Sequence, residues 1–168
     1  MQKYVFRKYD HKYVAFFRLE KKIITKALGS TAKIEHIGST AIPWLGGKGI
    51  VDIIVGIAKS KIDEVKKKLE KAGYEFREKA GTAERLFFRR DYTYKNKTRR
   101  VHIHLIKFGG KEWNTVIGFR DHLLQYPEMV EEYSNIKKEG IKKALGDWEK
   151  YRKHKEKFIE NVLRKILK

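Results

Sequence analysis

Two groups that could hold a phosphorylated ligand lie in the first third of the chain, the turn Gly38-Ser39 and the carboxylate of Asp52. A Gly-Ser turn that follows a short apolar run leaves backbone N–H groups and a hydroxyl free to bind phosphate oxygens. Asp52 interrupts a β-branched block at residues 50–55, which is typical of a strand buried on both faces. A buried carboxylate is costly unless it is paired or binds a cation, and Mg²⁺ prefers carboxylates together with phosphates. The alternative is that Ser39 only caps a turn.

A second candidate site is the histidine pair His102 and His104. The two residues alternate with apolar ones, so they share one face of a predicted strand. Imidazole suits Zn²⁺, Mn²⁺ or Ni²⁺ better than Mg²⁺. The structural alternative is that His102 is solvated and that His104 hydrogen-bonds a carboxylate without metal.

A third candidate is a basic segment, residues 89–100, with six basic residues, one acid and two interleaved tyrosines. Basic side chains beside aromatic rings could grip phosphates while the rings stack on bases, as in single-strand binders. The alternative is a solvated hairpin whose tyrosines pair across the strands. The candidate nucleic-acid contacts are Arg90, Tyr92, Tyr94, Lys97, Arg99 and Arg100.

Composition limits the class of protein and its partners. The 168 residues predict a single domain, 1–168, and the net charge of +19 favours a nucleotide, RNA, DNA or another polyanion as partner. A thermophile's enrichment in charged residues is the alternative source of that charge. The lack of cysteine excludes disulfides and thiolate metal sites. With no long apolar run and no signal-type N-terminus, the sequence predicts a cytoplasmic protein that does not contact membranes.

The elements that must position these residues form a sheet-rich core, about 1–110, and a helical C-terminal part, about 111–168. Hydrophobic periodicity predicts strands at 33–38, 49–57, 74–77, 85–94 and 98–108, and helices at 11–29, 60–72, 111–125, 128–144 and 147–167. Ser60 and Asp63 have the spacing of a capping box for the second helix. The fold class is therefore α/β or α+β, with a mixed sheet flanked by helices.

The segment from His36 to Ile53 resembles the signature of the GrpB-like family, a branch of the nucleotidyltransferase superfamily with the polymerase-beta-like fold. The likeness spans nearly the whole chain. It continues at Tyr9-Asp10, Phe87-Phe88-Arg89, Val101 to His104, Gly118 to Asp121, Tyr126-Pro127, Tyr133 with Lys137, and Tyr151 with Lys155.

This resemblance implies site roles. Gly38, Ser39 and Thr40 would form the phosphate turn, and Asp52 the catalytic metal carboxylate. If the family's sheet order holds, Asp52 and His104 lie on neighbouring strands and share a metal ion, with His102 as a further ligand. The ion would be Mg²⁺ or Mn²⁺, or Zn²⁺ or Ni²⁺ if histidine-ligated, and the substrate a nucleoside triphosphate. Active members of the superfamily carry a second acid two residues after the first, but Ile54 stands there, which argues against two-metal phosphoryl transfer.

The remaining candidate phosphate ligands are basic. Lys137 follows Tyr133, and Lys155 follows Tyr151, at the i,i+4 spacing of one helix face. We expect these lysines to line a cleft opposite the Gly38-Ser39 turn; simple packing is the alternative. Together with Lys48 and Arg89 they would neutralise transition-state charge.

The sequence thus predicts a nucleotidyltransferase-like protein that binds a nucleotide or another phosphate-bearing ligand and transfers a nucleotidyl group with a divalent metal. The alternative is a non-catalytic module that binds RNA, DNA or nucleotides through a basic surface.

Overall fold

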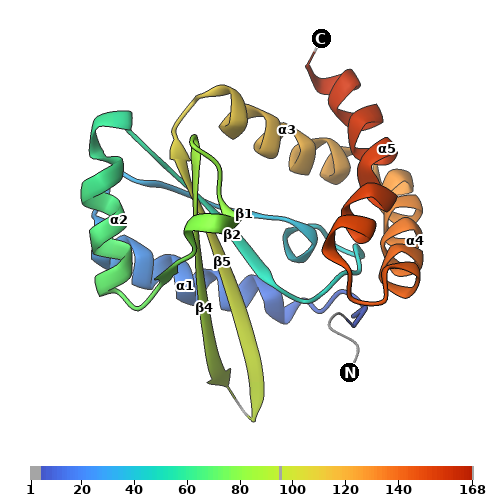
Figure 1. Cartoon of the computed structure of the whole chain (residues 1–168), viewed down its shortest axis with the longest axis horizontal. Helices are drawn as coiled ribbons and strands as arrows, with labels where there is room; N and C mark the ends of the chain where they lie inside the picture. Colours follow the sequence, from blue (N-terminus) through green and yellow to red (C-terminus); the bar gives the residue numbers. More distant parts are fainter. Residues whose placement is uncertain (1–4, 95, 168) are drawn as a thin grey trace.

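The protein is built on one mixed five-stranded sheet. The computed structural model describes residues 5–94 and 96–167. The strand order is β1-β2-β5-β4-β3, in which β2 and β5 are parallel and the other neighbours antiparallel. The strands are β1 (Lys33–Ile37), β2 (Val51–Ile57), β3 (Glu75–Phe76), β4 (Arg85–Tyr94) and β5 (Lys97–Lys107). β4 and β5 extend as a long hairpin beyond the other elements (Figure 1).

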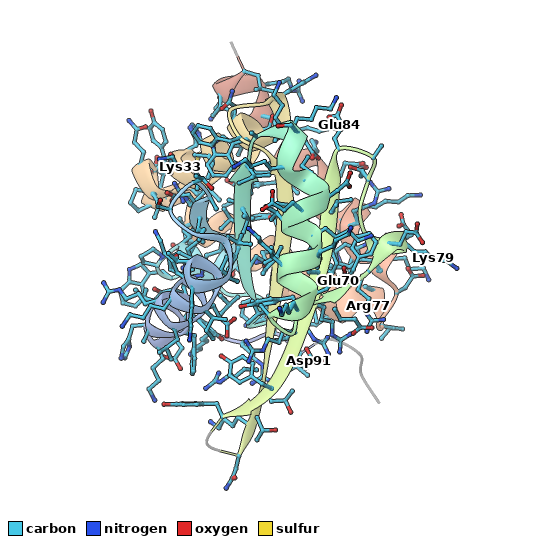
Figure 2. The ribbon with its side chains drawn as sticks, turned by 90° about the vertical axis from the view of Figure 1, so that its left-hand side faces the viewer. Lys33, Glu70, Arg77, Lys79, Glu84 and Asp91 are labelled. Carbon is cyan, nitrogen blue, oxygen red and sulfur yellow. The ribbon has the colours of Figure 1, made fainter. Side chains whose placement is uncertain are left out.

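One face of the sheet is covered by α1 (Lys12–Leu28) and α2 (Ile62–Lys71). Their apolar residues recur at helical spacing, so each helix presents one apolar stripe to the sheet. The stripe of α1 packs with alternate strand residues such as Ile53 and Ile103, both of which are fully buried. Figure 2 shows α2, which carries Glu70, in front of the strands. This layer is the main apolar core.

The opposite face is covered only in part. It meets α3 (Lys111–Gln125), whose Trp113 packs so closely on Gly56 that an added Cβ would lie 2.6 Å from the indole ring. α4 (Pro127–Ala144) and α5 (Trp148–Ile166) pack mainly on each other and on the loop after β1, in a second apolar cluster. They stand on one side of the sheet in Figure 1. Between them and the uncovered part of the sheet lies a cleft of about 1280 Å³.

These elements confirm the predicted fold class, including the helical C-terminal part. The predicted capping box is wrong, because Ser60 lies inside a short 3₁₀ turn and Lys61 precedes the helix without a side-chain cap. The predicted reversal between β4 and β5 includes Lys95, which lies outside the described residues. No helix in the described ranges is long and apolar enough to cross a membrane.

Candidate functional site

The turn after β1 lies directly against the carboxylate of Asp52. Gly38 has φ 71°, and a Cβ at this position would lie 2.7 Å from Asp52 Oδ2. Only glycine combines this left-handed backbone with such a close approach. The turn therefore brings Ser39, which lines the cleft, onto the same side of the sheet as Asp52.

Thr40 anchors this turn rather than lining the cleft, contrary to the expectation that it binds phosphate. Its side chain is 2% exposed, and its hydroxyl donates to the carbonyl of Ile50 at 3.1 Å. The same oxygen therefore accepts a hydrogen bond from His36 Nε2, at 2.9 Å. Burial lowers the pKa of His36 to about 4, so the ring is neutral, and it stacks on Phe17.

Arg120, on α3, is a positioning residue that the sequence argument did not single out. Its Nη1 donates to Glu35 at 2.8 Å and to the carbonyl of His36 at 3.0 Å. These bonds tie α3 to the strand that leads into the Gly38 turn. The Gly118 to Asp121 segment, already part of the family likeness, is the signal that could have identified it.

Asp52 lies between the two histidines of β5. Asp52 and the histidines lie on neighbouring strands, as the resemblance implied, and the parallel register places Asp52 opposite His102 and Ile54 opposite His104. His102 Nδ1 lies 3.2 Å, and His104 Nε2 3.7 Å, from Asp52 Oδ1. The ring of Phe87 contacts both imidazoles, with centroid distances of 4.7 and 5.3 Å. The second nitrogen of His104 is buried and has no hydrogen-bond partner in the described part of the chain.

The histidines keep Asp52 ionised. Burial alone would raise the pKa of Asp52, but hydrogen bonding and Coulomb attraction to His102 and His104 outweigh it. The pKa of Asp52 therefore lies well below its usual value. A carboxylate that holds its charge this firmly is a weak general base at neutral pH.

This donor set does not fit the metal site that the superfamily implies. Mg²⁺ requires several oxygen ligands, and Asp52 is the one carboxylate beside the two histidines. The place of the second acid is filled by Ile54, which is fully buried in the contact with α3. Among residues 5–94 and 96–167, no group of three or more His, Asp or Glu side chains is arranged to hold a metal ion.

Lys137, on α4, is a buried cation across the cleft. It is 6% exposed, and its Nζ lies 5.4 Å from the centroid of the Tyr133 ring. Within the described ranges it has neither an ion pair nor a hydrogen bond. Burial, and then the charge of Lys155, lowers the pKa of Lys137 to about 7, although Asp52 acts in the opposite direction.

Two further lysines line the same end of the cleft as Lys137, and each places its amine over an aromatic ring. Lys155 Nζ lies 4.3 Å from the centroid of the Tyr151 ring, and Lys48 Nζ lies 4.5 Å from that of Trp148. Burial, and then the charge of Lys48, lowers the pKa of Lys155 to about 8. We call Lys48, Lys137 and Lys155 the lysine cluster. Trp148 was not predicted to lie at the site. The only sign of this in the sequence was its position directly after Asp147, which caps α5.

Gly47 joins the lysine cluster to the turn. Its N–H and C=O both pair with the backbone of Arg7, which fixes the loop in place. A Cβ at Gly47 would lie 2.5 Å from Ser39 Oγ and 2.7 Å from Lys137 Nζ. The hydroxyl and the amine therefore approach the same point. Only the pair of neighbouring glycines, Gly46-Gly47, marked this position in the sequence.

Gly47→Ala is expected to weaken ligand binding with little effect on the fold. The added methyl group meets side-chain atoms rather than backbone, namely Lys137 Nζ and both Oγ and Cβ of Ser39, and the lower entropy of the unfolded chain offsets part of the strain. For a ligand bound between Ser39 and Lys137, we expect affinity to fall roughly tenfold, with the free energy of unfolding changed by less than about 1 kcal/mol. Calorimetric titration and urea unfolding would measure both. Gly118→Ala, which meets only the end of Ile166, is the control and should bind as the wild type does.

Arg89 lines the cleft but is already paired. It donates from Nε to both oxygens of Asp91 and also from Nη2. Arg100 donates to the same carboxylate, at 2.8 and 3.0 Å. Figure 2 shows Asp91 on β4 and Arg77 on the segment that follows β3. Because Asp91 occupies both guanidinium groups, Arg89 is a weaker phosphate candidate than the lysine cluster.

The basic hairpin does not present its residues on one surface. Strand alternation sends Arg100 to the cleft and the other contacts to the face covered by α1. Tyr92 packs on the main core, the Tyr94 ring meets Phe16 edge-on at 5.3 Å, and Arg99 lies over Phe16. Arg90 lies over the rings of Tyr74 and Tyr92. Lys97 is exposed near the hairpin end. Packing therefore accounts for Tyr92, whereas Tyr94 is 38% exposed and its proposed contact with bases stays a prediction.

The fold is that of the nucleotidyltransferases. A structure of the Cid1 poly(U) polymerase superposes on this chain with a TM-score of 0.57 and 12% sequence identity. The match covers 78% of this chain and 42% of that one. At this identity the likeness defines the class of fold and nothing finer.

Within that class, the chain belongs to the GrpB family, whose model, described as GrpB protein, matches residues 4–165. The glutamate-rich protein GrpB of Alkalihalophilus pseudofirmus is 30% identical over 153 residues, which are 89% of this chain and 88% of that protein. A UPF0157 protein of Vibrio cholerae is 34% identical over 137 residues, covering 82% and 69%. The crystal structure of GrpB from Enterococcus faecalis has a TM-score of 0.81 at 27% identity, with 97% of each chain covered. These findings confirm the family inferred from the sequence.

Proposed function

We propose that this protein binds a nucleotide, through its phosphates, in the cleft between the Gly38-Ser39 turn and the lysine cluster. The observation that carries the proposal is Lys137, a cationic side chain that is 6% exposed and forms neither an ion pair nor a hydrogen bond among the described residues. Burying a charge costs several kcal/mol unless a partner compensates it. An anionic ligand that reaches Lys137 supplies that partner.

Phosphate fits the surrounding groups better than a carboxylate does. Lys155 and Lys48 lie close enough to Lys137 to affect its pKa, so one ligand meets three cations. Ser39 adds a hydroxyl at the point that Lys137 Nζ also approaches. The cleft is much larger than a phosphate group and has room for a nucleoside as well. The Cid1 poly(U) polymerase, which has a similar fold, was crystallised with MgGTP bound. Nucleotides are therefore the first ligands to test.

The site favours binding over nucleotidyl transfer. Transfer in the superfamily rests on metal-holding acids, and Ile54 occupies one of those places. Asp52 and His104 remain the catalytic candidates, but the low pKa of Asp52 leaves it a poor proton acceptor. The alternative function is a module that binds nucleic acid. The net charge of +19 still supports it, but the packing of Tyr92 on the core does not.

The test compares two lysines of α5 that differ in position but not in charge. Lys155 lines the cleft, whereas Lys153 is exposed on the same helix. We expect Lys155→Met to lower the affinity for ATP roughly tenfold and Lys153→Met to leave it within about twofold, since exposed pairs contribute little. Calorimetry on both variants measures this difference. Equal losses would show that general charge attraction binds the nucleotide, and no binding by the wild type would refute the proposal.

A further inference from the structure

The lysine cluster supplies positive charge that metal ions would otherwise supply. Two-metal nucleotidyl transfer uses divalent cations, held by carboxylates, to neutralise the triphosphate. Here Asp52 lines the same cleft as three lysines, together with Glu75, Glu78 and Glu149 and a larger number of basic residues. The place of a second acid beside Asp52 is the buried side chain of Ile54. The cleft is therefore positive without any ion.

We propose that Lys48, Lys137 and Lys155 replace the metal ions, so that the cleft binds the polyphosphate chain of its ligand free of divalent cation. This inference rests on the proposed function and names its ligand class, a nucleoside di- or triphosphate in its metal-free form. The three amines come from separate elements, the loop before β2 and the helices α4 and α5. Packing of those elements, rather than a bound ion, holds the positive charge in place.

Electrostatic coupling among these groups supports a single anion site. The charges of Lys155 and Lys48 both lower the pKa of Lys137, and Asp52 raises it. Lys48 and Asp52 act on Lys155 in the same two directions. Repulsion among the lysines is relieved when a polyanion enters, because its negative charges attract all three amines.

The proposed site should bind the free polyphosphate more tightly than its magnesium complex. Mg²⁺ on a triphosphate cancels two of the negative charges that the lysines attract. It also keeps several waters, which must be accommodated or lost in the cleft. In a metal site Asp52 would bind the cation, but in this arrangement its negative charge repels the phosphates. Removing that charge should therefore help binding.

The experiment is a calorimetric titration with ATP at pH 6, in EDTA and in excess Mg²⁺, for the wild type and Asp52→Asn. We expect the wild type to bind in EDTA at least twofold more tightly than in Mg²⁺. We expect Asp52→Asn to bind at least threefold more tightly than the wild type in EDTA. A series of phosphate, pyrophosphate and tripolyphosphate should show affinity that rises with chain length.

Two results overturn the inference and leave nucleotide binding standing. One is wild-type affinity in EDTA that is equal to or weaker than that in Mg²⁺. The other is loss of binding in Asp52→Asn while circular dichroism shows an intact fold. Absence of ATP binding in every condition instead refutes the proposed function itself.

Discussion

Replacing Lys137 with methionine is expected to remove ATP binding and at the same time to stabilise the protein. The side chain is 6% exposed and its amine forms no ion pair among the described residues, so an apolar side chain of similar length suits the unliganded site better. Replacing buried charge with well-packed apolar groups is neutral or stabilising by about 1–4 kcal/mol. Loss of a buried cation from an anion site weakens binding by roughly 100-fold. Calorimetry and urea unfolding, run on the same preparation, measure the two effects.

The pH dependence of the free energy of unfolding should also reflect the burial of Lys137. The pKa of Lys137 is lowered from 10.5 to about 7 in the folded protein, so between these values the unfolded chain binds more protons. Stability contributed by this group therefore rises with pH from about 7 to 10.5, and the burial penalty is fully present below pH 7. Lys137→Met should flatten this rise, so its stability advantage is largest at pH 6.

Lys138→Met is the matched control, because Lys138 is the next residue and is exposed. It should change neither affinity nor the pH profile. If Lys137→Met destabilised the protein at pH 6 and bound ATP normally, Lys137 would be a structural residue. The proposed function would then lose its main support.

The second large effect concerns Arg90, which the sequence argument placed at a nucleic-acid surface. Its Nη1 lies 3.8 Å from Glu20, a carboxylate that is 2% exposed and accepts a hydrogen bond from the Tyr74 hydroxyl at 2.5 Å. Arg90→Met leaves that carboxylate without its cation. Breaking a fully buried pair by removing one partner costs about 3–5 kcal/mol. Because the Arg90 side chain is 29% exposed, we expect a smaller loss of about 2 kcal/mol by urea unfolding, with oligonucleotide affinity unchanged below the unfolding transition.

A double variant tests the cause of this loss. Arg90→Met combined with Glu20→Leu removes both charges, and the stability of the double variant should recover most of the loss seen in the single one. An Arg90→Met protein of wild-type stability with weakened oligonucleotide binding would instead restore Arg90 to a surface role. Urea unfolding and fluorescence anisotropy distinguish the two results.

Local patterns in the sequence determined the elements and the faces of the strands. The β-branched run around Asp52 predicted a strand buried on both faces, and the alternation of His102 and His104 predicted a shared face. These features depend on a period of two or on helical spacing, which neighbouring residues define by themselves. The family resemblance added the sheet order that joins the two strands. The same alternation, applied to Arg99 and Arg100, would have separated the hairpin residues between two faces.

Tertiary packing alone decided which charges are compensated. Thr40 is adjacent to Ser39 in the chain, yet its hydroxyl is used within the protein while Ser39 faces the cleft. Lys137 follows Tyr133 at ordinary helical spacing, and nothing in that spacing shows that its side chain is buried and forms no ion pair among the described residues. The free energy of a charge depends on solvent and on partners brought in from distant parts of the chain. The sequence therefore determined where Asp52 lies in a strand, and only the packing of α4 and α5 against that strand made the cleft a candidate phosphate site.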